Sequence, residues 1–344
     1  MSVIRVGVDI AKQVFVVHGV DQRGKAVLTK RLSRAQLGEF FAQLAPCRVA
    51  MEACASSHHW ARQLCAMGHE AVLIAPQFVA PYRRGGKNDD NDAQAICEAA
   101  GRPDMRFVPV KSAEQQAVLV LHRTRELLKG QRTALVNQTR GLLGEFGITL
   151  RTGVAALRQA LPAIVADADN GLPMLARESF AELDERLRDL DARLAASDRR
   201  LARLARQMPA AGRLRQVPGI GVLTATALVA SVGDARAFAS GRQFAAWLGL
   251  VPRQYSSGGK TRLGRITRRG DRYLRTLLVH GARALVQRAS SADDPRSQWL
   301  RALRARRGFN KATVAMAAKN ARRTWAVLAR GETYQPLART APAA

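Results

Sequence analysis

The chain has 344 residues, 47% of them hydrophobic and 5% aromatic, and 55 Lys and Arg against 27 Asp and Glu give it a formal net charge of +28. This length predicts two or three domains, and the apolar content excludes a disordered chain. The excess charge is mostly Arg, whose planar guanidinium suits phosphate, so nucleic acid is the expected partner. A membrane surface and an Arg-rich genome are the alternative explanations.

The sequence carries no sign of a membrane or secreted protein. No apolar run approaches the roughly 20 residues that span a bilayer, and the N-terminus has no signal-peptide pattern. The four cysteines, Cys47, Cys54, Cys65 and Cys97, form no CxxC pair. We therefore expect reduced thiols, no zinc site and a cytoplasmic protein.

The first hundred residues predict a mixed α/β unit. Residues 3–10 alternate between apolar and other side chains, and two further apolar runs at 14–20 and 26–32 flank the turn 21–24. These runs predict an antiparallel meander. A helix at about 34–44, a strand at 48–51, a helix at about 60–67 and a strand at 71–74 follow. This order is that of the ribonuclease H type of fold, which is an analogy and gives no function by itself.

The rest of the chain is predicted to be helical. Apolar spacings of three, four or seven indicate a helix at about 112–146 and a second one with an apolar seam from Leu183 to Leu204. A helical hairpin within the chain and a coiled coil between subunits both fit that seam. An apolar helix to about 232, a Gly-rich basic stretch and three helical segments ending near Arg330 follow, and the Pro/Ala-rich tail from Gln335 predicts disorder.

Four carboxylates occupy positions that would converge in such a fold. Asp9 lies near the end of the first strand, Glu52 ends the strand that begins at residue 48, and Asp89 and Asp92 share a face of a helix that begins with a polar run at 87–93. Together they would bind Mg²⁺, or Mn²⁺, for phosphoryl transfer. Singly, Asp9 fits a solvent-facing strand residue, and Asp89 and Asp92 fit a helix N-cap cluster.

Two segments in the last third of the chain predict contacts with nucleic acid. In the turn at 218–221, Gly219 and Gly221 would let the backbone approach a phosphate, as in a helix-hairpin-helix, although a simple turn between helices fits as well. The stretch 253–275 has one acid among many basic residues, from which we select Arg253, Lys260, Arg262, Arg265, Arg268, Arg269 and Arg272 as phosphate contacts. Ser257, within it, is a candidate nucleophile, although loop serines are common.

These residues resemble a known family, the insertion-sequence transposases with an Asp-Glu-Asp-Asp active site (the insertion sequence one-ten family, including its eleven-eleven subgroup), described as bridge-RNA-guided recombinases. The resemblance covers almost the whole chain in the family's order. It rests on Gly7-Val8-Asp9-Ile10-Ala11-Lys12, Met51-Glu52-Ala53-Cys54, Lys87-Asn88-Asp89, Asn91-Asp92-Ala93, Pro218-Gly219-Ile220-Gly221, and Gly249-Leu250-Val251-Pro252 leading to Ser256-Ser257-Gly258.

The resemblance implies α/β plus all-α architecture. A RuvC-like domain with a ribonuclease H type mixed sheet would span 1–110, a helical coiled-coil region 111–207, and a helical transposase domain with a helix-hairpin-helix 208–334, followed by a disordered tail at 335–344. Asp9, Glu52, Asp89 and Asp92 match the family's Mg²⁺-binding catalytic carboxylates. Ser257 matches its nucleophile, which forms a covalent phosphoserine link to DNA.

The resemblance also implies partners. The two parts of the active site would come from different subunits of a homo-oligomer, a dimer or tetramer, and a noncoding guide RNA would pair with donor and target DNA. We accordingly expect a bacterial, nucleoid-associated protein. This chain departs from the family pattern at Asn88, where Thr is frequent, and at Cys54-Ala55, where Thr-Gly is frequent. Both departures lie beside the carboxylates and leave the subgroup open.

Two other functions fit the residues. A metal-dependent endonuclease of the Holliday-junction type would use activated water, with Ser257 only lining a loop. A non-catalytic nucleic-acid binder would use the carboxylates structurally.

Overall fold

The computed structural model describes residues 2–86, 88–290 and 294–336. The chain divides into two compact units, the first comprising residues 1–115 and 232–237 and the second residues 116–231 and 238–344. The division into three domains and a tail stays a prediction. Lys87 of the predicted polar run and residues 337–344 of the predicted disordered tail lie outside the described residues.

The first unit is built on a mixed six-stranded sheet in the order β3-β2-β1-β4-β5-β6. β1 (Arg5–Ile10), β2 (Val14–Val20) and β3 (Ala26–Ser33) form the predicted antiparallel meander. β4 (Arg48–Glu52) lies parallel to β1, β5 (Glu70–Ile74) lies parallel to β4, and the short β6 (Phe107–Val108) is antiparallel to β5. The mixed sheet is therefore confirmed, although the first strand starts two residues later than predicted and Ile4 is 38% exposed.

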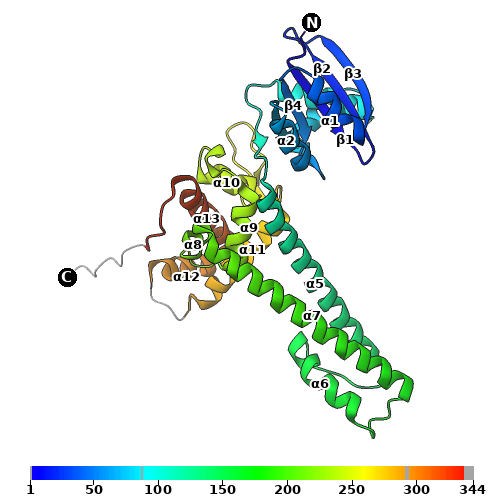
Figure 1. Ribbon diagram of the computed structural model, residues 1–344. Helices are drawn as coiled ribbons and strands as arrows, with labels where there is room; N and C mark the ends of the chain where they lie inside the picture. The colour runs from blue at the N-terminus through cyan, green and yellow to red at the C-terminus, as the bar shows by residue number, and fades with distance from the viewer. Residues whose placement is uncertain (1, 87, 291–293, 337–344) are drawn as a thin grey trace, which may run out of the picture. The chain divides into compact units, whose positions relative to one another are not determined.

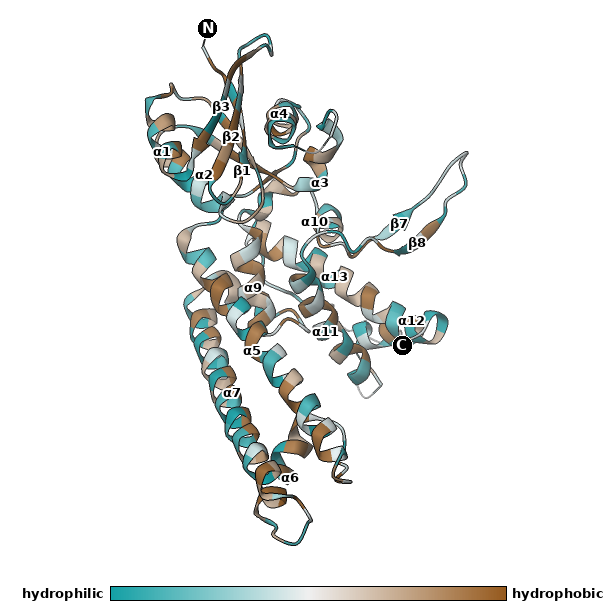
Figure 2. Ribbon diagram, turned by 90° about the vertical axis from the view of Figure 1, so that its right-hand side faces the viewer, coloured by the Kyte–Doolittle hydropathy of each residue, from teal (hydrophilic) through white to brown (hydrophobic). Residues whose placement is uncertain are grey.

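Helices cover both faces of this sheet (Figures 1 and 2). α1 (Arg34–Gln43) and α2 (Ser57–Ala66) bury Phe41 and Trp60 on one face, in a core with Val8. α4 (Asp89–Ala100) covers the other face with a stripe of small side chains that packs on Ala50 and Ile74. α3 (Pro76–Val79) and a short 3-10 turn (Ala80–Tyr82) precede α4. The apolar alternation in β1 indicated only the first of these two packed faces.

The second unit contains two long helices that run antiparallel. α5 (Ala113–Gly144) and α7 (Met174–Gln207) are joined by ion pairs between Arg125 and Asp198 at 2.6 Å and between Arg132 and Asp191 at 2.9 Å. α6 (Val154–Ala166), which the periodicity did not predict, packs into the same core. The leucines of the predicted seam, such as Leu187 and Leu201, are buried within the chain. A coiled coil between subunits stays a prediction.

The remaining helices of this unit follow α7. They are α8 (Pro209–Arg215), α9 (Val222–Val232), whose last residue falls in the first unit, α10 (Gly241–Trp247), α11 (Arg272–Arg288), α12 (Pro295–Arg307) and α13 (Phe309–Arg330), with a 3-10 turn at Ala235–Ala237 in the first unit. α13 packs against α8, α10, α11 and α12, so it is the central helix of this group.

One element differs in kind from the prediction. The Gly-rich basic stretch is not a simple loop but contains an antiparallel hairpin, β7 (Pro252–Gln254) and β8 (Leu263–Ile266). Figure 2 shows this hairpin as an arm that reaches away from the helices of its unit. Its residues are exposed on both sides, so the apolar alternation that marks a packed strand does not arise. No helix of the described residues is long and apolar enough to cross a membrane.

Candidate catalytic carboxylates and serine arm

Asp9 and Glu52 lie near the same end of two neighbouring parallel strands. Val8 of β1 pairs with Met51 of β4, and the two acids directly follow these partners in the chain. Carboxyl ends of parallel strands meet at one edge of a sheet, which is where ligands bind in open α/β sheets. Glu52 therefore ends its strand as predicted, beside Asp9.

α4 brings the other two acids to that edge because it crosses β1 at Gly7. A Cβ atom on Gly7 would lie 2.2 Å from the carbonyl oxygen of Ala93 and 2.5 Å from the backbone nitrogen of Cys97, so only glycine permits this approach. Asn88 caps the helix by accepting a hydrogen bond from the backbone N–H of Asn91 at 2.8 Å. Asp89 and Asp92 therefore stand in the first turn of a helix that is held directly against β1.

The four predicted acids act on one another electrostatically. Burial and, in decreasing order, the negative charges of Asp92, Asp89 and Glu52 together raise the pKa of Asp9 to about 6. Burial and nearby negative charge both disfavour the ionised form of a carboxyl group. The donor set consists of oxygens and carries excess negative charge, which fits a hard divalent cation.

Arginines, however, engage the helix end of this cluster. Arg83 donates from Nε to Asp92, whose side chain is nearly buried, and Arg31 pairs with Asp90 at 2.7 Å. Across the described residues, no three His, Cys, Asp or Glu side chains stand close enough to hold a metal ion. The fold thus brings Asp89, Asp92 and Glu52 close enough to Asp9 to affect its pKa, and Arg83 engages Asp92.

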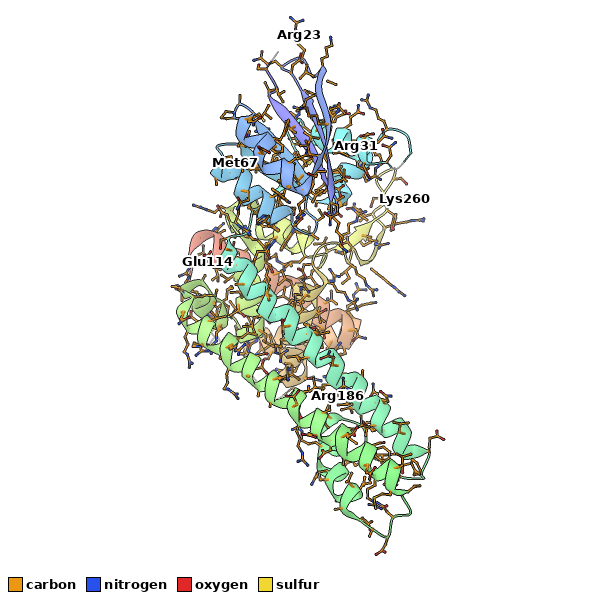
Figure 3. All side chains as sticks on the ribbon, turned by 45° about the vertical axis from the view of Figure 1, so that its right-hand side comes forward. Arg23, Arg31, Met67, Glu114, Arg186 and Lys260 are labelled. Carbon is orange, nitrogen blue, oxygen red and sulfur yellow. The ribbon has the colours of Figure 1, made fainter. Side chains whose placement is uncertain are left out.

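Ser257 lies at the tip of the hairpin arm. Its carbonyl accepts from the backbone N–H of Lys260 at 3.0 Å, and Gly258 and Gly259 between them have φ values of 55° and 75°. Positive φ at both central residues is the type I′ turn that two-residue hairpins favour. Figure 3 shows Lys260 on this exposed arm.

The two neighbouring serines differ in their hydrogen bonds. The Oγ of Ser256 accepts from Nε2 of Gln254 at 2.9 Å and from the backbone N–H of Arg262 at 3.2 Å, so it braces the two strands. Ser257 is exposed, and within the described part of the chain its hydroxyl makes no hydrogen bond. Of the two serines, Ser257 therefore has the hydroxyl that is available to approach a phosphate.

The predicted phosphate contacts follow the arm and its base. Arg253, Lys260, Arg262, Arg265, Arg268, Arg269 and Arg272 are all exposed. The base is fixed by close packing, since a Cβ on Gly249 would lie 2.0 Å from the carbonyl oxygen of Arg269. Arg275 donates to that carbonyl and to the carbonyl of Leu248 at 3.2 and 3.1 Å. A rigid base therefore carries a basic, exposed arm.

The turn at 218–221 has an internal packing role. The φ of Gly219 is 84°, and a Cβ added to Gly281 of α11 would lie 1.8 Å from the carbonyl oxygen of Gly219. Asn320 donates to the carbonyl of Pro218 at 2.9 Å. Gly221 has open space where a Cβ would stand. Packing on α11 and α13 thus explains Gly219, and a phosphate contact at either glycine stays a prediction.

A buried network at the start of α11 escaped the sequence reasoning. His122 is fully buried, and burial lowers its pKa to about 4, with Arg125 and Arg123 adding to the effect. Thr226 donates to the carbonyl of Val222 at 2.8 Å, so its Oγ1 accepts from Nε2 of His122 at 3.0 Å, and Nδ1 accepts from the hydroxyl of Tyr273 at 2.8 Å. A lone His inside a helical pattern was the only sequence signal.

Comparisons with known proteins agree on one family. A model described as "Transposase IS116/IS110/IS902 family" matches residues 211–298, and the IS110-type DEDD transposase model matches residues 6–148. The chain is 54% identical to a probable family 20 transposase of Pseudomonas aeruginosa, over 98% of this chain and 100% of that protein. It is 46% identical to the transposase for insertion sequence element IS1111A of Coxiella burnetii, over 96% and 90%, and 39% identical to that for IS1328 of Yersinia enterocolitica, over 97% and 99%.

Proposed function

The chain belongs to the IS116/IS110/IS902 family of transposases and is thus a DNA transposase, and we propose that it exchanges DNA strands through a covalent phosphoserine intermediate at Ser257. The observation that carries the proposal is the contrast at the arm tip, where Ser256 is engaged in hydrogen bonds and the exposed Ser257 hydroxyl is not.

The DEDD transposase family implies dependence on a divalent metal. We propose Mg²⁺, with Mn²⁺ as a substitute, held by Asp9, Glu52, Asp89 and Asp92. When bound, the metal supplies positive charge that stabilises the oxygens of the phosphoryl group during transfer. The protein's own contribution is to hold these carboxylates together, which the approach of α4 to Gly7 supports. Asp9 deprotonates more readily once a cation offsets its acidic neighbours.

The proposed reaction has two balanced steps. In the first, Oγ of Ser257 forms a bond to the phosphorus of a phosphodiester, the bond from phosphorus to one deoxyribose oxygen breaks, and the serine proton leaves while the released oxygen becomes a hydroxyl. In the second, the oxygen of a DNA hydroxyl forms a bond to the phosphorus, the bond from phosphorus to Oγ of Ser257 breaks, and the proton lost by the DNA hydroxyl is balanced by one gained at Oγ, which restores the serine. The phosphoester energy stays in the linkage, so strands rejoin without an external energy source. The arginines of the arm would hold the DNA backbone during both steps.

The remaining partners are proposals drawn from the family resemblance. A noncoding guide RNA would pair with donor and target DNA, and the carboxylates of one subunit would act on a phosphate held by the serine arm of another. A guide RNA would help explain the charge of +28, which by itself does not distinguish RNA from DNA. A homo-oligomer, a dimer or tetramer, is required by this arrangement.

Trapping of a protein–DNA adduct tests the proposal. The protein is incubated with RNA from its own element, donor and target DNA, and Mg²⁺, then denatured and run on a gel that detects labelled DNA attached to protein. Ser257→Ala abolishes the adduct. Ser256→Ala is the matched control and retains it, at a reduced rate because the arm loses a brace. An adduct that persists in Ser257→Ala refutes the serine assignment.

The same gel separates the alternative functions. A metal-dependent endonuclease that uses water yields free ends with no trapped protein, and its products form in Ser257→Ala as well. A non-catalytic binder yields neither product nor adduct. Loss of cleavage in Asp9→Ala with retention of DNA binding excludes that last function.

A further inference from the structure

The helices α12 and α13 carry positive charge that no acidic residue of the same stretch balances. Between Asp294 and Glu332 the sequence has no Asp or Glu, and its basic residues are Arg296, Arg301, Arg304, Arg306, Arg307, Lys311, Lys319, Arg322, Arg323 and Arg330. On α7, in contrast, some arginines pair with acids one turn earlier, as Arg188 does with Asp184 and Arg193 with Asp189. The flanking Asp294 and Glu332 pair with Arg296 and Arg330, each at 3.2 Å. The exposed Arg304, Arg306 and Arg307 form no ion pair within the described residues, so the charge at the end of α12 favours an anion from outside the chain.

Packing of α12 on α13 concentrates this charge (Figure 1). Burial lowers the pKa of Lys319, and the charges of Arg323 and Arg322 lower it further. Burial also lowers the pKa of Arg323, against an opposing effect of Tyr334 and with further lowering by Arg296 and Arg322. Asp294 offsets part of this repulsion through its contact with Arg296 at 3.2 Å. Phosphate groups between these cations would relieve what remains.

Aromatic rings accompany the cations along the same two helices. Four cation–ring pairs occur here, with distances from the charged group to the ring centroid of 4.4 Å for Lys319 on Trp299, 5.6 Å for Arg304 on Phe309, 5.2 Å for Arg323 on Tyr334 and 5.0 Å for Arg330 on Trp325. The rings of Trp299, Phe309 and Tyr334 are partly exposed. Such cation–ring pairs are weak at exposed sites. A cation can therefore leave its ring to contact a phosphate, and the ring can then stack on another planar group.

We propose that this basic–aromatic surface, α12 and α13 with Tyr334, binds single-stranded nucleic acid. Its cations contact phosphates, and the rings of Trp299, Phe309 and Tyr334 stack on unpaired bases. A duplex keeps the faces of its bases inside the stack, so only a single strand engages both kinds of group. The proposal rests on the proposed function only in taking nucleic acid as the partner. It adds a surface remote in sequence from the serine arm.

Charge removal at matched positions tests the phosphate contacts. Binding of fluorescein-labelled oligo-dT, oligo-U and a DNA duplex to the full-length Ser257→Ala protein is measured by anisotropy at several salt concentrations. The triple variant Arg304→Gln, Arg306→Gln, Arg307→Gln removes exposed charges from α12. The slope of log affinity against log salt for a single strand falls by about 0.7 for each phosphate that is no longer neutralised by an arginine, or about 2 for three.

The control variant removes the same charge elsewhere. Arg186, Arg199 and Arg200 are exposed on α7 and form no ion pair within the described residues, and Arg186 is labelled in Figure 3. Substituting Gln for all three leaves the affinity for single strands within about twofold and the salt slope unchanged. An equal decrease in both triple variants overturns the proposal, because it means that net charge alone attracts the strand.

Ring substitutions test stacking. Trp299→Leu lowers the affinity for a single strand about fivefold to a hundredfold, whereas Trp299→Phe retains most of it and the duplex changes less than twofold. Tyr334 lies beyond the end of α13, so Tyr334→Leu gives the same readout if Trp299→Leu unfolds the protein. Unchanged single-strand binding in both leucine variants, or an equal decrease for the duplex, overturns the proposal.

The two oligonucleotides distinguish the sources of the strand. A larger effect on oligo-U assigns the surface to unpaired RNA, a larger effect on oligo-dT assigns it to a displaced DNA strand, and both support the proposal. Adduct formation by the wild-type protein is measured separately. If the protein binds single strands at this surface but forms no adduct, this inference stands and the assignment of Ser257 as the nucleophile is wrong.

Discussion

Replacing Gly7 with Ala should separate the four acids proposed to be catalytic without changing any of them. The new Cβ would lie 2.2 Å from the carbonyl oxygen of Ala93, where ordinary contact begins at 3.4 Å, so α4 must move away from β1 by roughly 1 Å. Such overpacking costs about 1–3 kcal/mol of unfolding free energy. A displacement of this size in a catalytic group slows the reaction by on the order of 100-fold.

Urea denaturation and Mg²⁺-dependent cleavage measure the two effects of Gly7→Ala. The matched control is Gly38→Ala in α1 of the same unit, where the nearest atom to a Cβ is the Met67 methyl carbon at 3.9 Å. Because Ala favours helix over Gly, this control retains activity and gains up to about 1 kcal/mol. Wild-type cleavage and stability in Gly7→Ala would show that the contact between β1 and α4 does not position the acids.

Three further predictions concern charge, pH and packing. Asp9→Asn abolishes cleavage yet raises the melting temperature of the metal-free protein at pH 7.5, because the substitution removes one of four crowded negative charges. A melting temperature below that of the wild type contradicts this account. Because the folded pKa of His122 is about 4 and the unfolded value 6.5, the unfolded state binds the proton first, so stability is lost as pH falls from 6.5 to 4. Measured by urea denaturation, the unfolding free energy of His122→Gln falls about 2–3 kcal/mol less over this pH range than that of the wild type. Identical pH profiles for the two proteins refute this role of His122. Gly281→Ala places a Cβ 1.8 Å from the Gly219 carbonyl oxygen and destabilises the protein by more than about 2 kcal/mol. The control Gly130→Ala, whose Cβ lies in open space on α5, does not destabilise it. Equal melting temperatures for the two variants would contradict the close packing of Gly281 on Gly219.

Local patterns in the sequence were sufficient for the strands and helices from β1 to β5, but not for α3 or β6. Alternation in β1, the apolar runs of β2 and β3 and the turn between those two runs predicted the meander. The positions of Asp9 and Glu52 near strand ends followed from the same alternation and from strand lengths. Composition alone indicated a polyanionic partner, because net charge does not depend on the fold.

The serine arm shows why other features could not be read from the sequence. β7 and β8 are exposed on both sides, so no apolar period marks them, and only Gly258 and Gly259 signalled a turn. The two serines are equivalent as residue types. Their difference arises from Gln254 and Arg262, which the hairpin register brings to Ser256.

Sequence by itself thus determined which acids and hydroxyls the protein has, which strands contain them and what charge surrounds them. Tertiary structure decided which of these groups meet. The fit of α4 on Gly7 joins residues more than eighty positions apart, and the pairing of Arg83 with Asp92 depends on the turn that precedes α4. A periodic pattern records that a face is buried but not which partner buries it, because the period reflects only the geometry of one element.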